Sequence, residues 1–263
     1  MKRARTNLQV IKNYVIIFLS FAVLSIGLIL LAQYLMAINL LSNNLSWVFI
    51  LLRYIIAVVG LLYINRKIIK SKLLFKFQKD KASYLGSMVV LIFTIYNLWG
   101  LNGGFYLNTN TQKENFLFCL GPAIFEELLF RGIIFNRLCE INKTRKLGLY
   151  ISIFLSAFLF MISHLLIPDY SNLIDLFWQC MIAFGLGVLF ATIYFVTQNL
   201  ALTMIMHFAN NLNSYFFLGG VPILANLSTL EVNLISLTVY FLISFLLLLL
   251  KKKQKNQSWK ILS

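Results

Sequence analysis

Two adjacent glutamates, Glu126 and Glu127, lie in the middle of an apolar stretch of the chain and are followed by Arg131. The whole protein has only eight acidic residues. A charged side chain at the centre of a bilayer costs about 2.5–3.5 kcal/mol or more, and it contributes no apolar packing in return. An acid pair at this place is therefore a candidate catalytic site, in which one carboxylate acts as a general base.

The spacing of these residues indicates how the two carboxylates divide their roles. Residues four apart share one face of a helix, so Glu127 should meet Arg131 and remain ionised. Glu126 lies about 100° further round the helix. It can therefore point into a cavity and take a proton from water. The plain alternative is a purely structural ion pair.

The two histidines of the chain also lie in apolar segments. His164 follows Phe160 by four residues, and His207 precedes Asn211 by four. A single membrane histidine or asparagine is commonly a hydrogen-bonding contact between helices. Together with an acid pair and an arginine, however, they supply the base, imidazoles and oxyanion donor that water attack on an amide requires.

Composition shows which solvent surrounds these residues. The chain has 263 residues, of which 60% are hydrophobic, and the apolar residues occur in blocks long enough to cross a bilayer as helices. The sequence therefore predicts an all-α, polytopic membrane protein with about eight transmembrane helices. The predicted blocks are Tyr14–Met36, Trp47–Asn65, Tyr84–Gly100, Phe116–Leu138, Leu147–Ile167, Leu173–Val196, Leu200–Leu218 and Val232–Leu250.

The positive charge predicts the orientation of these helices. Lys and Arg number 23 against eight acids, and most of them fall in four clusters, which alternate with loops whose only base is Lys113. The clusters are Lys2–Lys12, Arg66–Lys81, Arg137–Lys146 and Lys251–Lys260, and the poor loops are Asn39–Ser46, Leu101–Asn115, Pro168–Asn172 and Gly219–Glu231. By the positive-inside rule, both termini should be cytoplasmic in the cell membrane. Because the clusters flank helices, we expect no nucleic-acid partner.

The chain reads as one membrane domain with three parts. Residues 1–115 would hold three membrane helices and a basic cytoplasmic loop, residues 116–218 the catalytic helices, and residues 219–263 the final helix and a basic tail. Three cysteines, Cys119, Cys139 and Cys180, have no metal or redox spacing, and the expected interpretation is that they are buried.

Three motifs together carry a family resemblance. Glu-Glu-x-x-x-Arg from Glu126 to Arg131, then Phe160 with His164, then His207 with Asn211, each on its own predicted helix, resemble the CAAX protease and bacteriocin-processing (Abi) family of intramembrane peptidases. The resemblance covers about residues 116–218. It implies an endopeptidase that hydrolyses a membrane-associated protein or peptide.

The resemblance also implies roles for the motif residues. Glu126 would activate the water together with His164, while His207 and Asn211 would hold the scissile carbonyl or its oxyanion. Glu127 and Arg131 would orient the first motif, and Phe160 would support the second. The compact His-Glu-x-x-His zinc spacing is absent. The resemblance favours a metal-free, glutamate-based mechanism that needs no cofactor, with zinc as the alternative.

Two other functions remain open at this stage. One is a non-catalytic membrane protein of the same fold that acts in bacteriocin self-immunity or regulates a membrane sensor. The other is a transporter with a carboxylate–histidine proton relay, although inverted repeats are not evident. The expected topology also separates His164, near the outer end of its helix, from His207, in the inner half of its own. A tilted or broken helix would have to bring them together.

Overall fold

The computed structural model describes residues 46–99, 109–165, 173–216 and 228–253, together with Gly27, Tyr34 and Leu35. These residues are almost entirely helical, and the described part contains no β-sheet, only an isolated bridge between Phe75 and Asn199. The elements are α2 (Ser46–Ile64), the π-helix η2 (Asn65–Ile69), α3 (Lys81–Leu98), α4 (Thr109–Glu127), the π-helix η4 (Leu128–Phe135), α5 (Asn136–Asn142), α6 (Gly148–His164), α7 (Leu173–Thr197), α8 (Leu200–Phe216) and α9 (Thr229–Lys253).

The all-α prediction is confirmed, and seven of the eight predicted blocks coincide with described helices. The first block, Tyr14–Met36, lies almost wholly outside the described residues. Within the described part, four helices are long and apolar enough to cross a membrane: α2 with η2, α3, α7 and α9. The chain is a multi-pass membrane protein, and the number of about eight spans stays a prediction.

Two acids expected in loops are instead helical, so that expectation was wrong. Glu114 lies in α4, which begins at Thr109, before the apolar block, and its side chain accepts a hydrogen bond from Ser46 of α2. Glu231 lies in the first turn of α9, where it and Ser228 exchange hydrogen bonds. Both helices begin with polar residues before their apolar blocks, because packing and capping contacts provide hydrogen-bond partners for the polar groups of their first turns.

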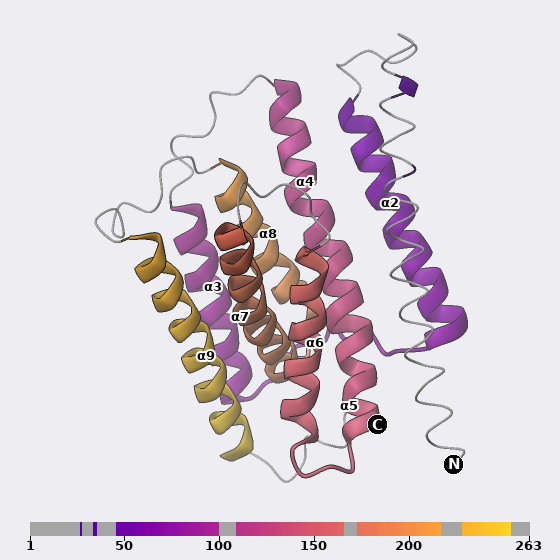
Figure 1. The fold of residues 1–263 in the computed structure, drawn as a ribbon. Coiled ribbons are helices and arrows are strands. Elements are labelled where there is room, and N and C mark those ends of the chain that lie inside the picture. Colours follow the sequence, from indigo (N-terminus) through magenta and orange to yellow (C-terminus); the bar gives the residue numbers. More distant parts are fainter. Residues whose placement is uncertain are drawn as a thin grey trace.

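The centre of the bundle is α7. All of its residues from Gly185 to Thr197 are buried, and it packs against α3, α6, α8 and α9 (Figure 1). A Cβ on Gly187 would lie 2.9 Å from both Cα and Cβ of Ala157 on α6. The absence of a side chain at Gly187 therefore lets these two helices approach closely.

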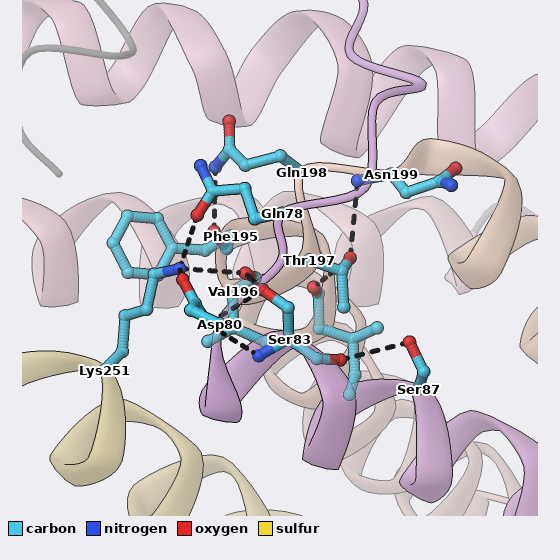
Figure 2. Close-up of polar contacts among 11 residues, drawn as sticks. Gln78, Asp80, Ser83, Ser87, Phe195, Val196, Thr197, Gln198, Asn199 and Lys251 are labelled. Atoms are coloured by element: carbon cyan, nitrogen blue, oxygen red, sulfur yellow. Dashed lines mark hydrogen bonds and ion pairs between the residues drawn. The ribbon is translucent and has the colours of Figure 1, made fainter. Parts of the chain in front are cut away.

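Most of the described basic residues gather at one end of the bundle; Arg53, Lys113 and Arg131 lie elsewhere. The 65–81 connection, the turn after α5 and the last turn of α9 all lie at the lower end of Figure 1. Lys251 of α9 is buried there and donates to Gln78, Asp80 and the carbonyl of Val196 (Figure 2). The end of α9 is thereby joined to the end of α7 and the start of α3. This common end agrees with the predicted clustering of positive charge, and the side of the membrane on which it lies stays a prediction.

Candidate functional site

The two glutamates occupy the last positions of α4, immediately before the π-helix η4. The wider π turn changes the hydrogen bonding of the backbone, and side chains bind its carbonyl groups. The hydroxyl of Ser71 and the amide of Asn136 both donate to the carbonyl of Gly132, and Ser156 donates to that of Phe130. π-Helical segments are frequent at functional sites because they redirect neighbouring side chains. Here the segment separates the acid pair from the rest of the helix.

Glu127 is the fixed carboxylate of the site. Its Oε1 atom accepts a hydrogen bond from Nη1 of Arg131 at 2.6 Å, and both side chains are fully buried. The same oxygen lies 3.0 Å from Nδ1 of His207 on α8. The predicted contact between Glu127 and Arg131 is therefore confirmed, and Glu127 also binds a histidine that sequence spacing could not connect to it.

Glu126 has a different environment. Its side chain is 27% exposed, and its Oε2 atom lies 3.9 Å from Nε2 of His207. That distance is too long for a direct hydrogen bond and leaves a gap that a bridging molecule can fill. The two ring nitrogens of His207 thus face the two carboxylates, Nδ1 at the buried one and Nε2 at the more exposed one.

His164 and Asn211 lie on neighbouring helices and bind backbone carbonyl groups. Nδ1 of His164 is 2.9 Å from the carbonyl oxygen of Phe160, and the amide of Asn211 donates to the carbonyl of Cys119 at 3.1 Å. Among the described residues, no hydrogen bond joins either side chain to Glu126 or Glu127. The structure therefore brings Glu126, Glu127, Arg131 and His207 into direct contact and leaves His164 and Asn211 at the edge of this group.

Phe160 links the two histidines despite their expected difference in depth. Its ring centroid lies 4.8 Å from that of His164 and 5.7 Å from that of His207. The same ring lies 4.3 Å from Cζ of Arg131. Both histidines therefore border one aromatic ring at the centre of the site.

The sequence interpretation missed Phe190 of α7. Its ring centroid lies 5.2 Å from Cζ of Arg131 and 5.6 Å from the ring of His207. The carbonyl of Gly187, one turn earlier, is 3.5 Å from Nη2 of Arg131. Nothing in the sequence singles these residues out, because α7 is apolar on every side.

Comparison with known families gives an independent result. Residues 114–213 match the family model described as type II CAAX prenyl endopeptidase Rce1-like. Over these residues, the chain is similar to the Rce1-like CAAX-protease family. The matched part of this CAAX-protease-like chain contains all seven predicted site residues, and the predicted resemblance is confirmed. No curated protein and no solved structure matched the chain in the corresponding searches.

The side chains available to bind a metal ion bear on whether zinc takes part in the reaction. Among the residues that the structure describes, no group of three or more His, Cys, Asp or Glu side chains is arranged to hold a metal ion. The Glu127 oxygen that faces His207 already forms an ion pair with Arg131. The three cysteines are buried and free, as expected.

Proposed function

We propose that this protein is an intramembrane endopeptidase that hydrolyses a peptide bond of a membrane-associated protein or peptide, using a water molecule activated by Glu126. The observation that carries the proposal is the unequal state of the two carboxylates. Arg131 and His207 engage Glu127, whereas Glu126 is partly exposed and lies 3.9 Å from its nearest described basic group. A general base must keep a free oxygen for the proton that it accepts.

His164 is suited to help Glu126 hold the water. A carbonyl oxygen can only accept a hydrogen bond, so the contact with Phe160 places the proton of neutral His164 on Nδ1. Nε2 then carries a lone pair and can accept a hydrogen bond from water. We therefore assign Glu126 as the base and His164 as its partner in orienting the nucleophile.

His207 and Asn211 are the proposed donors to the oxyanion. When the water oxygen bonds to the carbonyl carbon, the carbonyl π electrons move to the oxygen, and that negative charge needs nearby N–H groups. Nδ1–H of His207 faces Glu127, so donation from Nε2 requires the imidazolium form. Asn211 uses one amide hydrogen for the carbonyl of Cys119 and keeps a second.

The proposed mechanism uses no metal ion. Glu126 passes the proton it took from water to the leaving amine, which completes hydrolysis without an additional cofactor. The contacts of Glu127 support a metal-free mechanism. Its Oε1 atom, which lies nearest to Nδ1 of His207, already pairs with the cation of Arg131, so a metal ion would have to compete with that arginine. Zinc dependence would appear as loss of activity with a chelator and recovery on adding zinc.

The proposed substrate is a peptide held at the membrane, either by a lipid group or by a short apolar end. The proposed catalytic side chains lie on α4, α6 and α8, which pack among the apolar helices α2, α3 and α7 of a membrane protein. In vesicles, a farnesylated peptide ending in a CAAX sequence should be cut in preference to soluble casein. Equal cleavage of casein would contradict the membrane-bound substrate.

The decisive test replaces Glu126 by Gln, which keeps the shape of the side chain and removes its basicity. Purified wild type and Glu126→Gln would be placed in vesicles with a quenched fluorescent farnesylated CAAX peptide, in water enriched in heavy oxygen. Glu140→Gln is the matched control, because Glu140 pairs with Arg137 on a half-exposed face.

We expect wild type and Glu140→Gln to release a product whose new carboxyl group contains one heavy oxygen atom. Glu126→Gln should fold and release none. Wild-type cleavage by Glu126→Gln would refute the glutamate base. If Glu126→Gln released no product but kept its function in cells, the non-catalytic immunity or regulatory role would replace the peptidase.

A further inference from the structure

The guanidinium of Arg131 lies between two aromatic rings. Its Cζ atom is 4.3 Å from the centroid of Phe160 and 5.2 Å from that of Phe190. Phe160 belongs to one of the motifs, whereas Phe190 comes from α7, which supplies none of the proposed catalytic residues. Both rings are almost fully buried, so their contact with the cation is not weakened by water.

The same two rings also border His207. The centroid distances are 5.7 Å from Phe160, with perpendicular planes, and 5.6 Å from Phe190, with planes at 38°. A histidine bound only through Nδ1 can still rotate about that hydrogen bond. Because the rings of Phe160 and Phe190 border the imidazole at different angles, they restrict it to one orientation, in which Nε2 faces Glu126.

Close packing of α6 and α7 places the two rings. On α6, Phe160 follows Ala157 by three residues, and on α7, Phe190 follows Gly187 by three. Residues three apart lie on one helix face, so each ring lies one turn from the close contact between Gly187 and Ala157. The glycine that permits this contact thereby sets the position of Phe190.

We infer that Phe190 is a positioning residue of the proposed active site, which holds Arg131 and the imidazole of His207 in the orientation that Glu127 requires. This inference deepens the proposed peptidase function and rests on it for its kinetic consequence. The ring contacts of Phe190 with polar side chains of the site are those with Arg131 and His207. Phe190 acts through the side chains that it borders, so its loss should change turnover rather than substrate binding.

The experiment compares Phe190→Leu with Phe93→Leu. Phe93 of α3 packs against Phe190 edge-on, with centroids 6.3 Å apart, and also borders Tyr240. Both variants remove an aromatic ring from the same cluster, but only the first removes one from Arg131 and His207. Phe190→Met provides a second non-aromatic side chain, longer and more flexible than leucine, in case Phe190→Leu folds poorly.

In vesicles with the farnesylated CAAX peptide, Phe190→Leu should lower kcat by about tenfold, the effect of losing one buried cation–ring contact. KM should stay within about twofold. Phe93→Leu should keep kcat near wild type while losing a similar amount of thermal stability. Equal kcat values in the two variants would overturn the inference.

A second measurement does not depend on peptidase activity. With isotope-labelled histidine, nitrogen–proton spectra contain signals from only two residues, His164 and His207, and a His164→Gln variant assigns them. Phe190→Leu or Phe190→Met should shift or broaden the His207 signals and leave His164 unchanged, while Phe93→Leu should alter neither. Unchanged His207 signals in both Phe190 variants would contradict the positioning role, even if the protein proves not to be a peptidase.

Discussion

Nδ1 of His207 lies 3.0 Å from Oε1 of Glu127, although the two residues are 80 positions apart in the chain. The same oxygen accepts a hydrogen bond from Nη1 of Arg131. One buried carboxylate oxygen therefore joins the first and third motifs of the proposed site. Glu127 thus orients His207, and Arg131 supplies the opposite charge beside Glu127.

Replacing Arg131 by Ala should destabilise the protein strongly. The change leaves the carboxylate of Glu127 buried without its cation, and breaking one side of a buried pair costs about 3–5 kcal/mol. Expression in membranes and the thermal unfolding temperature in detergent would measure the loss, and cleavage should fall as well. Arg137→Ala breaks the partly exposed pair with Glu140 and should cost no more than about 1 kcal/mol. Equal stability of the two variants would contradict the role of Arg131.

Substitution of His207 or Asn211 by Ala should lower turnover more than substrate binding. Donors to an oxyanion act mainly in the transition state, and each contributes about 2.7–4 kcal/mol. Steady-state kinetics in vesicles should therefore show kcat reduced by about a hundredfold or more with KM little changed. A variant whose KM rises while kcat is maintained would indicate that the residue binds the substrate instead.

Gly187→Ala should impair both stability and activity. The new methyl group would lie 2.9 Å from Cα and Cβ of Ala157, so α6 and α7 would have to move apart, at a cost of about 1–3 kcal/mol. That movement also displaces the rings beside His207. Gly60→Ala on α2 is the control, since nothing lies within 4 Å of its added Cβ. Thermal unfolding and kcat should be unaffected or slightly improved in the control, and a similar response in both variants would argue against the close contact.

The junction around Lys251 should make stability depend on acidity. Partial burial raises the pKa of Asp80, but the hydrogen bonds and charge of Lys251 and the hydrogen bonds from Ser83 outweigh it and hold the pKa below its ordinary value of 3.8. A lowered folded pKa stabilises the protein above the unfolded value, and the benefit is lost as the pH falls through the folded value. Unfolding temperatures of wild type should therefore drop below about pH 4, with a smaller drop for Asp80→Asn. Parallel curves for the two proteins would contradict the prediction.

Local rules were sufficient for part of this structure. The long apolar blocks predicted the helices, because a bilayer requires backbone groups to bond within one segment. The spacing of Glu127 and Arg131 predicted their contact, since both lie within one stretch of helix. The sequence placed Lys251 in the basic cluster Lys251–Lys260 and gave no sign of a buried contact. The structure instead buries it against Val196 and Asp80, which is a tertiary contact without a local signal.

The rest of the site depends on how the helices pack. The contact of His207 with Glu127 requires α4 and α8 to lie side by side, and no periodicity in either helix specifies their relative height. Phe190 is one of many apolar residues on a helix buried on all sides, so hydrophobic pattern cannot distinguish it. The π-helix η4 has ordinary helix-forming residues, and its wider turn is supported by Ser71 and Asn136 from outside the segment.

The π-helix η4 also makes the length of this segment critical. Each residue of an α-helix turns the chain by about 100°, and a π segment holds an additional residue within the same stretch. Deleting one residue between Leu128 and Phe135 would remove this additional residue and convert the segment to an α-helix, so the groups within it would turn relative to the helices around them. The carbonyls of Phe130 and Gly132 would then turn away from the side chains of Ser156, Ser71 and Asn136 that now donate to them. Natural relatives should therefore vary in the amino acids of this segment much more readily than in their number.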